Sequence, residues 1–327
     1  MVEIKSPGQG IQPYFLEALI GKKAQRDFSI GDYFFESDIH ERKIAPRHYS
    51  FRRPFGIPVR YHDYEELVSG TNVNLVEFHL SYRDLEEDAG SFLNGVQDID
   101  LVVHCPELFD RDHVLDLCSE DQKYRAHSIA ELQRVVNITR ELKKYFHTPD
   151  RPIIIINVGG FNKMGFLPEE QRLNMYKKVA DALDHIDGDD VELTIQTMPP
   201  FPWHFGGQSY HNLFINPDEI VEFCAETEYR ICLDISHSQM ACNYYKWSLD
   251  EFINKVAKYT AHLHVVDALG IDGEGIQIGQ GDVDFMQLGK TLDSLMPDVP
   301  FIPEIWHGHK QKGAGFWLAL EFLEDYL

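Results

Sequence analysis

Residues 152–197 read PIIIINVGGFNKMGFLPEEQRLNMYKKVADALDHIDGDDVELTIQT, and this stretch decides the class of fold. It begins with a short apolar run (152–158) and ends with another (191–197), which are the lengths expected of buried strands. Between them, the apolar residues of 168–186 recur at intervals of three and four, a pattern that predicts an amphipathic helix. A strand, a helix and a second strand in this order predict parallel strands joined by a crossover helix.

The same alternation extends from residue 57 to the end of the sequence. Eight apolar runs are expected to be strands: Ile57–His62, Leu75–Leu80, Asp100–His104, Pro152–Val158, Val191–Thr197, Tyr229–Ile235, Ala261–Val266 and Phe301–Trp306. Amphipathic stretches such as residues 128–146 separate them. Eight strand–helix units predict an α/β fold of the (β/α)8 TIM-barrel type. An open, doubly wound sheet is the competing prediction, although no GxGxxG motif follows the first strand to support a dinucleotide-binding version.

Composition excludes several classes of protein. The 327 residues hold 30 Lys and Arg against 53 Asp and Glu, so the formal net charge is −23. This charge argues against a nucleic-acid partner, which needs a basic surface. No apolar run approaches the roughly 18 residues that a membrane-spanning helix needs. The first ten residues carry no apolar signal core, so we expect no membrane partner and a cytoplasmic location. The five cysteines include no CxxC pair and are expected to be mostly buried thiols.

Polar residues gather where the predicted strands end, and in a barrel the active site lies at the carboxyl ends of the strands. These residues are Glu77, His79, His104, Glu107, Asn157, Gln196, Asp234, His237, His264, Asp267 and Glu304. Burying so many ionisable groups together is costly unless a cation or a substrate satisfies them. The sequence therefore predicts a polar pocket at this end of the barrel, with a metal ion in it.

Three consecutive strands supply the best metal ligands, which are Asp234, His264 and Glu304. Gln196, on the strand before them, could add its amide oxygen. Carboxylate, imidazole and amide oxygen together suit Mn²⁺, Zn²⁺, Co²⁺ or Fe²⁺, with Mg²⁺ also possible. We therefore expect one divalent metal ion as the cofactor.

The order and spacing of several motifs resemble the xylose-isomerase-like barrel superfamily, which holds sugar (phosphate) isomerases and epimerases together with endonuclease IV. The motifs are LVVHCPE (101–107), CLDISHS (232–238), HLHVVDALG (262–270), GEGIQIGQGDVDF (273–285) and PEIWHGH (303–309). The resemblance implies one divalent ion on residues 196, 234, 264 and 304, with residues 196 and 304 as the acid/base pair. It also implies that His237 contacts the substrate. The chain departs from this pattern at Gln196, because glutamine cannot accept a proton at neutral pH.

A metal-dependent sugar or sugar phosphate isomerase or epimerase acting through an enediolate is therefore the expected function, with Glu304 as the base. Glu107, Glu77 or Asp267 would supply the second proton-transfer group. Further expected substrate contacts are His237, His104, Asn157, Asp267, and Trp203 and His204 in the aromatic loop 198–212. His307 and His309 are either substrate contacts or solvent-facing residues.

The N-terminal segment carries a second resemblance. Residues 4–39, which include SPGQGI and LIGKK, are similar to the second half of the antifreeze-like (SAF) domain at the C-terminus of sialic acid synthases. We expect a partial SAF-like segment (1–40), a linker (41–56) and the barrel (57–327). The resemblance implies the C-terminal part of a synthase fusion in sialic-acid-like (nonulosonic acid) biosynthesis. The expected partners are a small sugar, a synthase domain in the same natural chain and, as an open possibility, further copies in an oligomer.

Two other functions stay open. Gln196 favours a non-catalytic sugar-binding or scaffold module attached to a synthase, because it could keep a metal site while removing one base. An endonuclease IV-like phosphodiesterase is a distant third. Asn157 stands where that branch has a histidine, and the segment after the seventh strand lacks its Asp-x-His pair.

Overall fold

Eight parallel strands form the centre of the protein, in a computed structural model that describes residues 11, 16–17, 19–24, 26–39, 45–147, 149–204 and 207–327. The strands pair in chain order as β1 (Gly56–Val59), β2 (Leu75–His79), β3 (Asp100–His104), β6 (Ile153–Ile156), β8 (Glu192–Gln196), β12 (Arg230–Asp234), β13 (Thr260–His264) and β16 (Phe301–Ile302). A parallel bridge between Phe55 and Phe301 joins the last strand to the chain just before the first. The predicted barrel is therefore confirmed, and the alternative of an open, doubly wound sheet is wrong.

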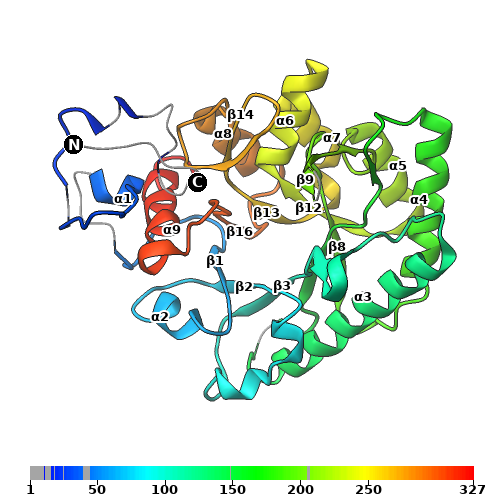
Figure 1. Cartoon of the computed structure of the whole chain (residues 1–327), viewed down its shortest axis with the longest axis horizontal. Helices are drawn as coiled ribbons and strands as arrows, with labels where there is room; N and C mark the ends of the chain where they lie inside the picture. Colours follow the sequence, from blue (N-terminus) through cyan, green and yellow to red (C-terminus); the bar gives the residue numbers. More distant parts are fainter. Residues whose placement is uncertain are drawn as a thin grey trace.

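Helices surround the barrel and cover its outer face (Figure 1). They are α2 (Tyr64–Val68), α3 (Gln122–Lys143), α4 (Glu169–Leu183), α5 (Pro217–Thr227), α6 (Ile235–Tyr245), α7 (Leu249–Val256), α8 (Phe285–Leu295) and α9 (Lys310–Leu323). Short 3₁₀ turns lie at Asp84–Glu86, Ala89–Ser91, Asp110–Asp112 and Ala257–Tyr259. The described loops contain four short antiparallel strand pairs. Three are hairpins: β4 (Leu108–Phe109) with β5 (His113–Val114), β9 (Trp203–His204) with β10 (Gly207–Gln208), and β14 (Asp267–Leu269) with β15 (Gly273–Ile276). The fourth joins two separate loops, β7 (Phe161–Asn162) with β11 (Tyr210–His211).

Helix α3 begins earlier than the apolar pattern predicts. The Asp121 carboxylate accepts hydrogen bonds from the backbone N–H groups of Lys123 and Tyr124, which satisfies two donors of the first turn. This cap starts the helix at Gln122, whereas the apolar spacing becomes regular only at residue 128. The polar first turn is thus held by capping and not by burial.

The barrel interior has two layers, because alternate strand residues face inward. The lower layer is apolar and consists of Leu75, Val102, Ile155, Cys232 and Ile302. Two residues further along the same strands, a polar layer follows: Glu77, His104, Asn157, Asp234 and Glu304. The strand pattern therefore places the ionisable groups near the carboxyl ends of the strands. All five cysteines of the chain are buried and free.

Two segments end differently from the prediction. The last strand is only two residues long because Pro303 has no N–H to donate to a neighbouring strand. Glu304 therefore lies on a loop just beyond the barrel. Strand β13 stops at His264, and Asp267 opens the hairpin β14–β15 instead of ending the strand.

The chain before the barrel is described in part. Helix α1 (Glu36–Ile39) contacts α9 (Figure 1). Residues 45–55, in the predicted linker, pack on the barrel: the Tyr49 ring stacks on Trp317, and Arg53 is buried and pairs with Asp293. Residues 4–10, which hold SPGQG of the SAF-like motif, lie outside the described residues, and nothing in the described part tests the resemblance, which stays a prediction. Within the described ranges, every helix is too short or too polar to cross a membrane.

Candidate active site

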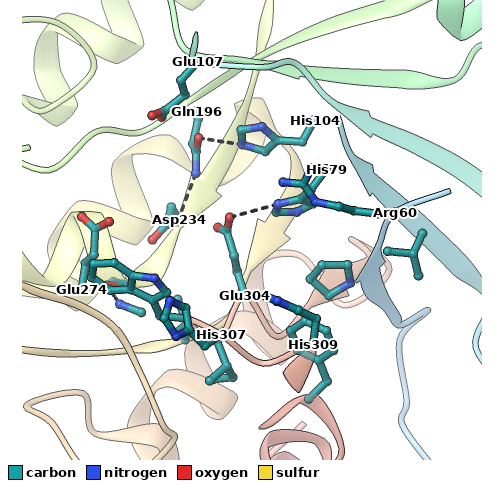
Figure 2. A pocket seen from close by; sticks show the side chains of 18 of the residues that line it. Arg60, His79, His104, Glu107, Gln196, Asp234, Glu274, Glu304, His307 and His309 are labelled. Carbon is teal, nitrogen blue, oxygen red and sulfur yellow. Dashed lines mark hydrogen bonds and ion pairs between the residues drawn. The ribbon is translucent and has the colours of Figure 1, made fainter. Parts of the chain in front are cut away.

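A cavity of about 450 Å³ lies at the carboxyl ends of the barrel strands, where the predicted site residues meet (Figure 2). Seven of the polar residues predicted at the strand ends line it: His79, His104, Glu107, Gln196, Asp234, His237 and Glu304. His264 and Glu77 lie fully buried and are not part of the lining. Asn157 and Asp267 are also buried outside the lining. Trp203 and His204 form strand β9, and their side chains lie outside the described part of the structure.

Three predicted metal ligands converge on one point. Ligand atoms of Asp234, His264 and Glu304 all lie within 4.8 Å of one another. The Nδ1 atom of His264 is 2.6 Å from Glu304 Oε2 and 3.6 Å from Asp234 Oδ2. Burial disfavours a charge on His264, but the nearby Glu77 and Glu304 carboxylates raise the pKa of its ring well above the ordinary value. Two carboxylates and an imidazole gathered around one buried point fit a divalent cation.

The Glu77 carboxylate holds the far side of the His264 ring. His264 Nε2 lies 3.1 and 3.2 Å from the two Glu77 oxygens and donates its proton there. His79 Nε2 and His262 Nε2 lie 2.8 and 2.9 Å from the same carboxylate. Burial alone would favour the neutral acid, yet the histidines keep the pKa of Glu77 well below its ordinary value. Without a cation, the charged ring also donates through Nδ1 to Glu304. Because Glu77 holds the Nε2 proton, loss of the Nδ1 proton would leave that nitrogen free to bind a cation beside Asp234 and Glu304, as a metal-ligating histidine does.

Gln196 lies between His104 and the three predicted ligands. Its Nε2 is 3.2 Å from Asp234 Oδ2 and 3.2 Å from His264 Nδ1, and its Oε1 is 3.2 Å from His104 Nε2. The amide oxygen, predicted to be a ligand, thus faces His104 in this arrangement. Burial lowers the pKa of His104, and this neutral ring donates through Nδ1 to the Cys105 carbonyl. The His104 Nε2 atom then needs a hydrogen-bond donor. A half-turn of the Gln196 amide would place its NH₂ group there and would aim its Oε1 atom at Asp234 and His264.

His237 and Glu274 form one wall of the cavity. The Asp234 carboxylate caps helix α6 by accepting from the His237 N–H at 2.8 Å. The His237 ring donates through Nδ1 to the Thr197 carbonyl at 2.8 Å and turns Nε2 toward Glu274 Oε2, 3.8 Å away. Burial opposes charging of His237, but Asp234 and Glu274 raise its pKa. Burial also raises the pKa of Glu274, which the sequence prediction did not include.

Glu274 reaches the cavity because its hairpin packs closely on the loop after β16. Gly275 has φ +67, and a Cβ atom there would lie 3.2 Å from the Trp306 Cβ. The Trp306 N–H donates to the Gly275 carbonyl at 2.8 Å. The alternating glycines of GEGIQIGQG indicate a closely packed backbone in this segment. Only the fold shows that Glu274 is the residue that faces the cavity.

Glu107 and Asn157 act as a pair. The Asn157 amide donates to Glu107 Oε1 at 3.3 Å and accepts from the Gly159 N–H at 3.1 Å. Glu107 lines the cavity, whereas Asn157 stands behind it. Asn157 is therefore placed to position Glu107, and its contact with a substrate stays a prediction.

Asp267 has a structural environment, contrary to its expected role in substrate binding. Its carboxylate is fully buried and accepts from the backbone N–H groups of Ala268, Gly279, Gly281 and Val283 at 2.8–3.1 Å. Four backbone donors occupy its oxygens, so none is left for a sugar or for proton transfer. It ties the segment 279–283 to strand β14.

Known proteins share both the family and the fold. Residues 66–326 match the family described as Xylose isomerase-like TIM barrel, and the chain belongs to this family. An uncharacterized protein of Methanocaldococcus jannaschii is 27% identical over 201 residues, which cover 61% of this chain and 68% of that protein.

Among solved structures, a D-tagatose 3-epimerase-like protein has 18% identity and a TM-score of 0.56, covering 84% of this chain and 96% of its own. Endonuclease IV from Thermus thermophilus has 15% identity and a TM-score of 0.53, covering 84% and 98%. Identities this low show the shared fold. Sugar epimerases and endonuclease IV thus share this barrel with the chain.

Proposed function

We propose that the protein is a metal-dependent isomerase or epimerase of a small sugar. The observation that carries the proposal is the convergence of Asp234, His264 and Glu304 within 4.8 Å at the floor of the cavity. Glu77 behind His264 supports it, because a buried carboxylate that fixes the proton on Nε2 prepares Nδ1 to bind a cation. The family and the sugar epimerases among similar structures agree with this assignment.

Asp234, His264, Glu304 and the turned amide of Gln196 would hold the ion. A divalent cation there would act as a Lewis acid toward a substrate carbonyl and an adjacent hydroxyl. Glu304 would remove the proton from the carbon between them, because its carboxylate lies at the edge of the cavity and stays ionised. Burial would raise its pKa, but His264 and His79 lower it. His104 and His237 would hold substrate hydroxyls.

A second proton-transfer group is needed, since Gln196 cannot serve. Of the carboxylates named from the sequence, Glu77 is sealed beneath His264 and Asp267 is enclosed by backbone amides, which leaves Glu107. Glu274 joins it as a candidate, because its raised pKa favours the protonated form that an acid needs. Its place beside His237 gives it a partner for the proton. We assign the acid role to Glu274 and keep Glu107 as the alternative.

Solvent exchange tests this function. The metal-loaded protein would be incubated in D₂O with a panel of ketoses and ketose phosphates, and deuterium at carbon would be followed by NMR. We expect uptake with at least one sugar and its loss in Glu304→Gln. The matched control is Glu226→Gln, an exposed carboxylate on α5 that is not part of the cavity lining. Failure of every sugar to exchange, with metal bound, would contradict the proposal.

A non-catalytic sugar-binding module is the second candidate, and Gln196 is the observation that favours it. That protein would bind metal and sugar with no deuterium uptake in the same experiment. We further propose that the natural chain carries a synthase domain and acts in sialic-acid-like biosynthesis in the cytoplasm. The present sequence would then divide into a partial SAF-like segment (1–40), a linker (41–56) and the barrel (57–327). The SAF resemblance of residues 4–39 supports this, and the mass of the native protein in its own cells would test it.

A further inference from the structure

Arg60 stands apart from most of the acidic residues of the cavity. Carboxylates of Glu107, Asp234 and Glu274 lie on one side of Glu304, and Arg60 enters from the other side, just after β1 (Figure 2). Among the described residues that line the cavity, Arg60 is the sole Lys or Arg. Asp63, whose Oδ1 accepts from the Arg60 N–H, also lines the cavity here, and His307 and His309, on the loop after β16, complete this corner.

The Arg60 guanidinium is only weakly neutralised by protein. Its Nη1 donates to Asp84 Oδ2 across 3.3 Å, and this same oxygen already accepts from the Ser81 N–H and Oγ at 2.7 Å each. Within the described ranges, no contact is made by Nε or Nη2 of Arg60. The backbone is fixed, because the Arg60 N–H donates to Asp63 Oδ1 at 2.6 Å. The side chain is 43% exposed, so a fork of N–H donors is presented at the cavity from a rigid base.

The loop carrying the histidines is held in a defined shape. His307 has φ +60, a left-handed conformation that is uncommon for a residue with a side chain and persists where the surroundings enforce it. Its carbonyl accepts from the Lys310 N–H at 3.0 Å, and the Gly308 N–H donates to Ile305. This turn brings both imidazoles to the cavity rim.

His309 is held as a neutral ring at the rim of the cavity. Burial, which is the largest cause, and the nearby charges of Lys310 and Arg60 lower the pKa of His309 to about 4. A bound anion would reverse this effect by offsetting those cations. The neutral ring can meanwhile donate one hydrogen bond to an oxygen atom.

We propose that Arg60 and His309 form a subsite for the anionic group of the substrate, a phosphate ester or carboxylate on the sugar. This inference rests on the proposed function, in which the carbonyl end of the same sugar lies beside Glu304 and the predicted metal ligands. The Arg60 guanidinium on one side and the carboxylates of Glu107 and Glu274 on the other would orient such a sugar in one direction. A bidentate arginine contact suits either oxyanion, and the cavity volume of about 450 Å³ suits a small sugar derivative.

Calorimetric titration of the metal-loaded protein tests the subsite without requiring turnover. The probes are a neutral ketose, its phosphate ester and a sugar acid of the same length. We expect at least one anionic sugar to bind tenfold to a hundredfold more tightly than the neutral one. The tighter of the two anions identifies phosphate or carboxylate as the preferred group. Equal or tighter binding of the neutral sugar would overturn the proposal.

Variants then assign the preference to Arg60. Arg60→Gln is expected to abolish it, Arg60→Lys to keep part of it, and His309→Asn to weaken it. The matched control is Arg52→Gln, because Arg52 is 80% exposed, pairs with Asp293 and lies outside the cavity. A preference unchanged in a folded Arg60→Gln protein would overturn the subsite. Loss of deuterium exchange with an intact anion preference would instead contradict only the proposed isomerisation.

Discussion

Asp267 and Glu304 follow neighbouring strands of the barrel, β13 and β16, but their surroundings differ completely. Four backbone N–H groups surround the Asp267 carboxylate at 2.8–3.1 Å. Glu304 faces ionisable side chains, with His264 Nδ1 at 2.6 Å and His79 Nδ1 at 3.7 Å, and is 28% exposed to the cavity. A carboxylate enclosed by amides stabilises a loop, whereas one that faces imidazoles and solvent can take a proton or a cation.

The same contrast orders the other acidic residues. The Asp234 carboxylate caps α6 through Oδ1 and turns Oδ2 toward His264. One oxygen therefore stabilises the helix, and the other can bind a cation. Glu77 is enclosed, but by histidines instead of amides, so it controls the proton of His264. Among the described residues, Glu274 has one ion-pair partner, His237 at 3.8 Å, and is the least satisfied carboxylate of the group. Each substitution below should therefore affect either chemistry or stability.

The largest expected effect is on turnover in Glu304→Gln. The glutamine keeps the shape of the side chain but cannot accept the substrate proton, so kcat should fall by about 10²- to 10⁴-fold. Unfolding should stay cooperative, as followed by circular dichroism. A variant that keeps more than a tenth of the activity would remove Glu304 from its role as base.

Asp267→Asn should show the opposite profile. It removes the charge that receives four N–H groups and turns one acceptor into a donor facing them. The free energy of unfolding should fall by about 2–3 kcal/mol, measured by urea titration. Metal content should be unchanged in the folded fraction. Unchanged stability combined with lost metal would place Asp267 with the site after all.

Glu274→Gln should lower kcat by about tenfold to a hundredfold and leave KM within a few-fold. The groups facing Glu274 are His237, Asp234, Glu107 and Glu304. Burial raises the pKa of Glu274, so the protonated acid is lost as pH rises through that value. The kcat of the unsubstituted protein should therefore decline as pH rises through the pKa of Glu274. This decline should be missing from the pH profile of the variant. If Glu107→Gln removes it instead, Glu107 is the acid.

The smallest effect is on the acid stability of the metal-free protein. The pKa of Glu77 lies well below 4.5 in the folded state, despite burial, because of His264, His262 and His79. The unfolded chain then binds more protons than the folded one just below pH 4.5, so stability should fall as pH decreases through this window. In Glu77→Gln this part of the pH dependence should vanish, as measured by thermal unfolding from pH 6 to 3. A steeper decline in the variant would contradict the assignment.

Local patterns were enough to predict the barrel and the floor of its cavity. Alternation along a strand puts Glu77 and His79, or His262 and His264, on one face, and the ends of parallel strands meet by geometry alone. Residues on loops could not be placed in this way. Glu274 depends on the contact between Gly275 and Trp306, Arg60 on its weak pairing with Asp84, and the enclosure of Asp267 on amides twelve to sixteen residues away. These are tertiary contacts, which no short pattern encodes.

Metal content is the most direct test of the central claim that Asp234, His264 and Glu304 bind a cation. Elemental analysis would be performed on the purified protein and on the Asp234→Ala/His264→Ala double variant after incubation with Mn²⁺, Zn²⁺, Co²⁺ or Fe²⁺ and removal of free ions. We expect about one ion per chain in the protein and loss of that ion in the folded variant. Absence of metal from the protein, or equal metal in both, would contradict it.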